Sequence, residues 1–215
     1  MLPEDKPVAS PALPPKAKSW RDKWRQKDWR SMSSTIGLLL LAPLIAWLIS
    51  AFALQSYQVD GQSMETTLSN GDRLIVDKVP RTWSRITNHA YIPQRGDIMI
   101  FNAPVTIGGF GGQKQLIKRV IGLPGERVVI KRGAVTVYNQ ASPKGFNPDR
   151  SDSYQITSSR TTGDVDIKLD NDEVFMLGDN RANSEDSRFF GPVPVKDIVG
   201  KLALRILPLS KVDKF

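Results

Sequence analysis

The stretch Asn70-Gly71-Asp72-Arg73-Leu74-Ile75-Val76-Asp77 is the clearest indication of the fold class. It opens with a turn signal, Asn-Gly-Asp, and continues as a short run dominated by aliphatic side chains. Branched side chains pack well on a pleated sheet, and Asn-Gly favours the backbone angles of a tight turn. We therefore predict a β-strand at residues 73–77.

The same pattern recurs further along the chain. Short β-branched or aromatic runs bounded by turn signals lie at residues 97–101, 127–130 and 173–177. No long amphipathic helical pattern accompanies them, and Gly or Pro punctuates the segments between them. The predicted fold class is therefore mainly β, with many short antiparallel strands.

Upstream of these strands the chain is apolar. No charged residue occurs between Ser31 and Asp60, and Ile36–Leu54 is almost wholly apolar. A helix needs about 20 apolar residues to cross the hydrocarbon core of a bilayer, so we predict a transmembrane signal-anchor helix at residues 35–55. The alternative is a cleavable signal peptide ending near Ala51-Phe52-Ala53, but the apolar core of such a peptide is shorter, at roughly 7–15 residues.

Charge predicts the topology of this segment. Residues 1–30 hold eight Lys or Arg and four Asp or Glu, an excess of +4 within a formal net charge of +8. Basic flanks stay in the cytoplasm, so we expect a single-pass protein of the cell membrane. Its parts are a cytoplasmic basic tail at 1–34, the anchor, and an extracytoplasmic catalytic β domain at 56–215. Polar residues 139–172 are interpreted as an inserted region with little core.

Composition excludes several classes of function. Outside the tail the basic residues are scattered, without the dense basic face or motif of a nucleic-acid-binding domain. The chain has no Cys and one His, so disulfides, thiolate metal clusters and multi-histidine sites are excluded. That histidine, His89, lies in a polar, turn-like stretch and is interpreted as solvated instead of as a catalytic base. We expect no metal and no cofactor.

Ser63 is the candidate nucleophile, in Gly61-Gln62-Ser63-Met64 after the predicted anchor. A serine hydroxyl is a poor nucleophile unless a neighbouring base accepts its proton. Gly61 would allow close approach to a substrate and direct backbone N–H groups at an oxyanion. Gly-x-Ser is also common in ordinary turns, so the assignment requires a base nearby.

Lys118 is the candidate base, within Gln115–Gly122. If this run is a strand, alternate side chains share a face, and Lys118 lines up with Leu116 and Val120. Aliphatic surroundings hydrate a charged amine poorly, so the pKa of the lysine falls and its neutral form becomes available. The alternative is a lysine whose ammonium group extends to water.

Asp179, Glu185 and Asp186 form an acidic cluster. No histidine accompanies them, and Arg181 and Arg188 are available to neutralise them. We therefore interpret the cluster as a turn held by ion pairs, not as a metal site.

Taken together and in order, four segments resemble the type I signal peptidases, peptidase family S26, of the bacterial single-span kind. The segments are Gly61–Met64 with Thr67-Leu68, Arg95–Phe101, Lys118–Glu126 and Gly178–Arg188. The resemblance implies an antiparallel catalytic domain of the signal peptidase/LexA-like complex β fold, with an apolar surface resting on the lipid bilayer. It also implies a membrane-bound serine endopeptidase, a hydrolase that removes N-terminal signal peptides from exported preproteins. The cleaved preproteins would carry small residues at −1 and −3, and the secretion translocon is a further expected partner.

The resemblance also assigns roles to individual residues. Ser63 would be the nucleophile and Lys118 the general base of a Ser/Lys dyad that acts through an acyl-enzyme. Ser184 would hydrogen-bond and orient the lysine amine. The ion-pairing residues that would hold the site's scaffold are Asp179, Asp186 and Arg188.

One departure from the family concerns the oxyanion hole. Some members place a serine hydroxyl at the position of Gly61 as an oxyanion donor. Glycine offers no such group, so we expect the backbone N–H groups of Ser63 and Gly61 to form the oxyanion hole.

Two rival functions fit parts of the pattern. One is a self-cleaving regulator of similar fold, which the predicted anchor argues against. The other is a catalytically silent relative that binds the secretion machinery. The joint presence of Ser63, Lys118 and Ser184 argues against silence, because a scaffold needs none of them in those places.

Overall fold

The structure, a computed structural model, divides into two compact units, Met1–Trp47 and Leu48–Phe215. It describes residues 34–47, 53–87, 91–103, 114–150, 154, 156 and 160–215. His89 and the glycine-rich segment 108–112 lie outside these residues.

The first unit contains a helix at residues 34–47 with exposed aliphatic side chains, among them Leu38 and Leu39. Within the described part of the chain, no helix is both long and apolar enough to cross a membrane. The predicted span at 35–55 includes residues 48–52, which are not described, and its last residues lie in a strand. The anchor therefore stays a prediction.

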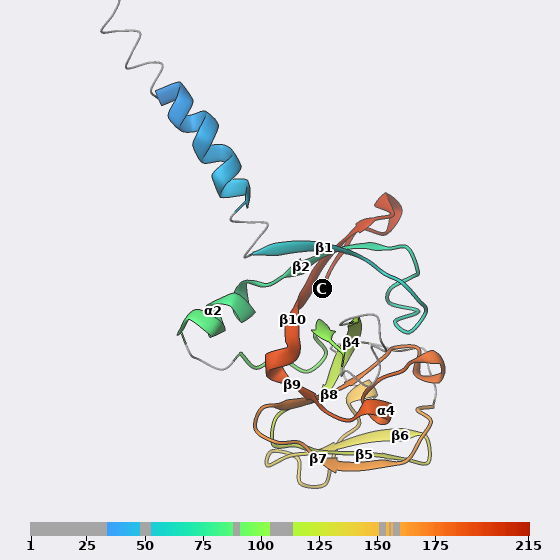
Figure 1. The fold of residues 1–215 in the computed structure, drawn as a ribbon. Coiled ribbons are helices and arrows are strands. Elements are labelled where there is room, and N and C mark those ends of the chain that lie inside the picture. The colour runs from blue at the N-terminus through green and yellow to red at the C-terminus, as the bar shows by residue number, and fades with distance from the viewer. Residues whose placement is uncertain are drawn as a thin grey trace, which may run out of the picture. The chain divides into compact units, whose positions relative to one another are not determined.

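The second unit is built on an antiparallel sheet with the order β1-β2-β10-β3-β4-β8-β9, and β11 pairs with β10 (Figure 1). Strand β10 is long, pairs with β2 along one edge and with β3 along the other, and is bulged in both pairings. The strands are β1 (Leu54–Gln58), β2 (Arg73–Asp77), β3 (Ile98–Asn102), β4 (Gln115–Gly122), β8 (Glu173–Leu177), β9 (Val193–Pro194), β10 (Ile198–Leu207) and β11 (Asp213–Lys214).

A smaller antiparallel sheet has the order β6-β5-β7. Its strands are β5 (Arg127–Lys131), β6 (Ala134–Tyr138) and β7 (Val165–Lys168). Figure 1 shows this sheet at the opposite end of the unit from β1 and β2. One face of it packs against β4 and β8, burying Ile121 and Phe175 in a shared core.

The predicted mainly β fold is confirmed. The run at 73–77 is strand β2, and the runs at 97–101, 127–130 and 173–177 correspond to β3, β5 and β8. The inserted region is less peripheral than predicted: it supplies β7, and its Tyr154 and Leu169 are buried in the core of the smaller sheet.

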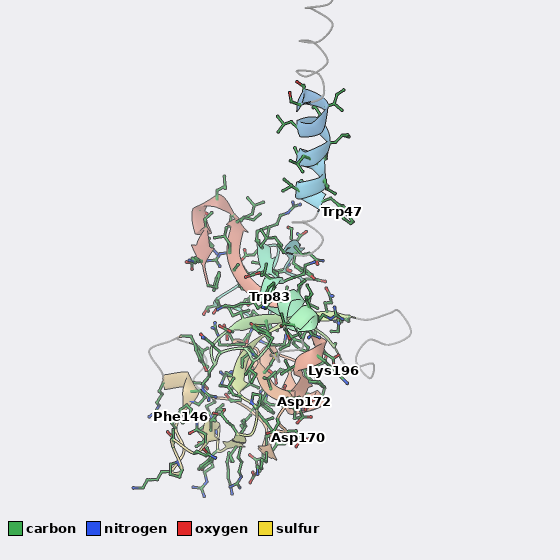
Figure 2. The ribbon with its side chains drawn as sticks, turned by 90° about the vertical axis from the view of Figure 1, so that its left-hand side faces the viewer. Trp47, Trp83, Phe146, Asp170, Asp172 and Lys196 are labelled. Carbon is green, nitrogen blue, oxygen red and sulfur yellow. The ribbon has the colours of Figure 1, made fainter. Side chains whose placement is uncertain are left out.

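The unit also contains a nine-residue helix that the sequence pattern did not indicate, α2 (Val79–Thr87). Trp83 lies on it (Figure 2). The remaining helical elements are short: α4 (Ser187–Phe190), η2 (Pro148–Arg150), η3 (Arg181–Asn183), η4 (Val195–Asp197) and η5 (Leu209–Lys211).

Candidate active site

Strand β4 carries Lys118 in the interior of the larger sheet. It pairs with β3, where Lys118 lies opposite Met99, and only 2% of the lysine is exposed. The alternation expected of a strand is present, because Arg119 projects to the other side and meets an acidic partner there. The predicted burial of Lys118 is confirmed.

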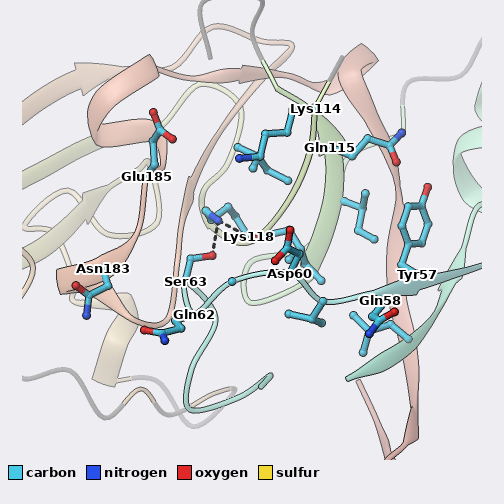
Figure 3. A pocket seen from close by; sticks show the side chains of 16 residues that line it. Tyr57, Gln58, Asp60, Gln62, Ser63, Lys114, Gln115, Lys118, Asn183 and Glu185 are labelled. Carbon is cyan, nitrogen blue, oxygen red and sulfur yellow. Dashed lines mark hydrogen bonds between the residues drawn. The ribbon is translucent and has the colours of Figure 1, made fainter. Parts of the chain in front are cut away.

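The turn after β1 brings Ser63 to this lysine. Met64 and Leu68, which follow the serine, are fully buried and fix the turn to the domain. Lys118 Nζ lies 2.7 Å from Ser63 Oγ and 3.0 Å from the carbonyl oxygen of Ile117 (Figure 3). Two residues 55 positions apart are thus in direct hydrogen-bond contact, as a nucleophile and its base must be.

The surroundings of Lys118 change its acidity. Burial lowers the pKa of its amine from 10.5 to about 8, because a charged amine is poorly solvated there. Asp186, Glu185 and Asp179 oppose the shift by favouring the charged form, and Lys114 adds to it. A substantial fraction of the amine is therefore neutral in mildly alkaline solution.

A buried ion pair supports the strand next to the lysine. Arg119 donates to both carboxylate oxygens of Asp179, at 2.8 and 2.7 Å, and to the carbonyl oxygen of Gly96. Thr67, from the turn that carries Ser63, donates its hydroxyl to the same carboxylate at 2.6 Å. Asp179 therefore ties the nucleophile's turn to strand β4. Arg119 is its partner, a residue that the sequence analysis left without a role.

Asp186 and Arg188 form a second ion pair, at 2.7 Å. Asp186 also accepts a hydrogen bond from the Gly178 N–H, and Arg188 donates to the carbonyl oxygens of Arg181 and Ser184. These bonds hold the segment 178–188 in one conformation. The expectation that Asp179, Asp186 and Arg188 form ion pairs is thus met, with one change of partner: Arg181 pairs instead with Asp149 of the inserted region.

Ser184 differs from its expected arrangement. Its hydroxyl is buried beside Gly178, and among the described residues it has no hydrogen-bond partner, so it makes no bond to Lys118. The space is tight, because a Cβ at Gly178 would overlap the Ser184 hydroxyl and the Ser63 carbonyl oxygen. Ser184 is therefore adjacent to the turn of the nucleophile without being bonded to the base.

The expected oxyanion donors also differ. The Gly61 N–H donates to Asn70 Oδ1 at 3.0 Å, so it is engaged within the loop and is not directed at a substrate. The Ser63 N–H makes no hydrogen bond within the described residues. Of the two predicted sources, only the Ser63 N–H is free to meet an oxyanion in this conformation.

A cavity of about 520 Å³ opens at the lysine and serine (Figure 3). One side of it is formed by Gln58–Ser63 and the other by Lys114–Lys118. Two chain segments thus flank the reacting groups, and Asn183 and Glu185 complete the rim. Within the described residues no group of acidic or histidine side chains is arranged to hold a metal ion.

Comparison with known proteins identifies the family of the chain. A family model described as signal peptidase, peptidase S26, matches residues 32–207. The chain is 32% identical to the probable signal peptidase I-1 of Synechocystis sp., covering 85% of this chain and 86% of the relative. It is 34% identical to signal peptidase I of Leptolyngbya laminosa, covering 84% and 80%, and 32% identical to signal peptidase I P of Bacillus subtilis subsp. natto, covering 91% and 96%.

Among solved structures, signal peptidase I of Enterococcus faecalis V583 is 27% identical, with a TM-score of 0.38, covering 52% of this chain and 97% of that chain. The family model and the three relatives each cover most of the chain. They show that the chain belongs to the signal peptidase family, peptidase S26.

Proposed function

We propose that the chain removes N-terminal signal peptides from exported preproteins as a serine endopeptidase with a Ser/Lys dyad. Ser63 is the nucleophile and Lys118 the general base. The 2.7 Å contact between Ser63 Oγ and the buried Lys118 amine is the observation that carries this proposal. Membership of the signal peptidase family supports the substrate class.

The reaction begins when neutral Lys118 accepts the Ser63 proton as the hydroxyl oxygen attacks the scissile carbonyl carbon. The resulting oxyanion is stabilised by the Ser63 N–H. Lys118 then gives the proton to the leaving amine, and the C–N bond breaks to leave an acyl-enzyme. A water molecule, deprotonated by Lys118, attacks the ester carbonyl carbon. The C–O bond to Ser63 then breaks, Lys118 returns the proton to Ser63 Oγ, and the signal peptide leaves as the free acid.

Ser184, Asp179, Asp186 and Arg188 act as supports in this proposal. The two ion pairs hold β4 and the segment 178–188 around the dyad. The Ser184 hydroxyl, which has no partner among the described residues, would have to move to bond the amine. Gly61 contributes to the oxyanion hole only if its bond to Asn70 is released.

We propose that the cavity beside Ser63 receives the substrate. A preprotein segment placed between Gln58–Ser63 and Lys114–Lys118 has its scissile carbonyl at Ser63. Small side chains at −1 and −3 let its backbone approach the serine closely. The anchor at 35–55 is proposed to keep the catalytic unit on the outer face of the cell membrane, where confinement with the substrate raises the effective concentration.

Cleavage of a preprotein with Ala at −1 and −3 tests the proposal. The full chain is reconstituted with this substrate, and Ser63→Ala and Lys118→Ala are compared with the unchanged protein. Both variants should lose almost all activity, since each removes one half of the dyad. Lys131→Ala, at an exposed site on the smaller sheet, is the matched control and should retain activity. Substantial cleavage by either dyad variant would refute the assignment, and binding without cleavage by the unchanged protein would favour the silent relative.

A further inference from the structure

The Gln62–Ser63 peptide carries the donor proposed for the oxyanion hole. Its N–H group is that of Ser63 and its oxygen is the carbonyl oxygen of Gln62, and both residues line the cavity of the site (Figure 3). The peptide is trans, so its oxygen and its N–H point in opposite directions. A group that holds the Gln62 oxygen therefore also sets the direction of the Ser63 N–H.

Asn180 holds this oxygen from across the site. Its side-chain Nδ2 donates to the Gln62 carbonyl oxygen at 3.1 Å, although 118 positions separate the two residues. The backbone N–H of Asn180 donates to the next carbonyl oxygen, that of Ser63, also at 3.1 Å. Two successive carbonyl groups of the nucleophile's turn are thus bound by a single asparagine.

The Gln62 oxygen has a second partner, within its own turn. The Glu65 N–H donates to it at 3.2 Å and closes the turn that contains Ser63. This bond is internal, so it moves together with the turn. The bond from Asn180 joins the turn to the segment 178–188, and it therefore fixes the orientation of the peptide relative to the rest of the site.

Asn180 lies between two buried ion pairs. The residue before it, Asp179, is bound to Arg119. The residue after it, Arg181, is bound to Asp149. The backbone is therefore held on both sides of the asparagine. A group that orients a catalytic donor acts best when its own position is fixed by surrounding bonds, and Asn180 meets this condition.

The usual role of an asparagine at the start of a helix is not used here. Asn180 directly precedes η3, and asparagine is a preferred capping residue. Its side chain nevertheless makes no capping hydrogen bond to the described residues of η3. Asn183 Nδ2 donates to Asn180 Oδ1 at 3.5 Å, and this contact leaves Asn180 Nδ2 directed at Gln62. The amide is therefore committed to the nucleophile's turn.

We propose that Asn180 is a positioning residue for the oxyanion hole. Its amide holds the Gln62–Ser63 peptide so that the Ser63 N–H faces the oxygen of the scissile carbonyl group. The Gly61 N–H is engaged by Asn70, so the catalytic effect of the hole depends on the direction of the Ser63 N–H. The inference rests on the proposed peptidase function and adds to it a residue outside the dyad and its ion pairs.

Kinetics of the full-length Asn180→Leu protein test this role. Leucine keeps the branched outline of asparagine but has no side-chain donor, and the backbone N–H to Ser63 is retained. With a soluble peptide that carries Ala at −1 and −3, we expect kcat to fall about tenfold and KM to stay unchanged. The loss should be smaller than the hundredfold or more that follows removal of an oxyanion donor, because the Ser63 N–H is still present and is only less well directed. Asn171→Leu, in the exposed turn between β7 and β8, is the matched control and should keep full activity.

Inhibition by a peptide aldehyde distinguishes positioning from a loss of folded protein. Ser63 Oγ forms a bond to the aldehyde carbon, the C=O double bond becomes a single bond, and the Ser63 proton passes to Lys118. The oxygen of this adduct occupies the oxyanion position, so the inhibition constant should rise about tenfold in Asn180→Leu, in parallel with the fall in kcat. A smaller folded fraction would lower kcat without changing the inhibition constant. The midpoint of the pH–rate profile should stay unchanged, because Asn180 carries no charge.

Three results would overturn the proposal. They are a kcat equal to that of the unchanged protein, a lower kcat with an unchanged inhibition constant, and a shifted pH midpoint, which would mean that Asn180 acts on Lys118. A failure of the catalytic assignment has a different outcome. In that case the unchanged protein would not cleave the peptide, or Ser63→Ala would cleave it as well.

Discussion

At the scale of single residues, the chemistry depends on the protonation of Lys118. The pKa of its amine is lowered to about 8 by burial, so the fraction of neutral base grows as the pH rises towards that value. Below about pH 8, kcat/KM should rise about tenfold per pH unit and then level off. A pH–rate profile with a peptide substrate that does not titrate in this range measures the effect. A flat profile across neutral and mildly alkaline pH would exclude lysine as the base.

The same burial of Lys118 lowers the stability of the folded chain. The pKa of the amine is 10.5 when solvated and about 8 in the folded chain, so the folded state binds the proton more weakly. The burial therefore lowers the free energy of unfolding by its full amount below pH 8, where Lys118 is protonated in both states. This destabilisation disappears as the pH rises to 10.5. Lys118→Met should therefore abolish activity yet raise the free energy of unfolding by up to about 3 kcal/mol near neutral pH.

Guanidinium titrations at neutral and strongly alkaline pH check this expectation, with the gain shrinking at the higher pH. Lys114→Met, at the rim of the cavity, serves as the matched control and should change stability little at either pH. A Lys118→Met protein that is less stable than the unchanged chain at neutral pH would contradict the argument.

At the scale of elements, one buried ion pair joins the inserted region to the active-site segment. Arg181 on η3 is 1% exposed, and its guanidinium forms a bidentate pair with Asp149 on η2. Asp149→Asn would leave a buried cation without its partner, which costs about 3–5 kcal/mol. We expect this loss of stability in chemical denaturation, together with reduced cleavage because Arg181 also binds the Gly178 carbonyl oxygen.

Two comparisons make that prediction specific. Asp166→Asn breaks the solvent-exposed pair between Asp166 on β7 and Arg127 on β5, and it should leave stability unchanged within error. Replacing both buried partners, with Asp149→Leu and Arg181→Met, should recover much of the stability without restoring the hydrogen bond to Gly178. If Asp149→Asn behaves like Asp166→Asn, the pair does not support the site.

The elements also show what could be predicted from the sequence. The strands were predictable because β-branched runs between turns bury a face every second residue, and the same periodicity placed Lys118 and Arg119 on opposite sides of β4. Helix α2 was missed because nine residues containing Pro80 give too short a helical pattern. The pairing of Asp149 with Arg181 has no local signal, since 32 residues separate them and only tertiary packing brings them together.

At the scale of the whole molecule, the two units have different tasks in the proposed function. Leu48–Phe215 contains every residue assigned to the site and several hydrophobic cores. Catalysis should therefore reside in the second unit, and the first should act by holding enzyme and substrate on one surface.

Removing residues 1–47 separates these two tasks. The shortened chain should cleave a short soluble peptide with an unchanged kcat, because the dyad and its ion pairs are retained. Its kcat/KM for a preprotein embedded in vesicles should fall about a hundredfold or more, because the effective concentration provided by a shared membrane is lost. Circular dichroism establishes that the sheets have formed, and parallel assays on the two substrates give the ratio. Equal losses on both would mean that the N-terminal unit is needed for the fold of the site, and no loss on either would mean that membrane confinement contributes nothing to the activity.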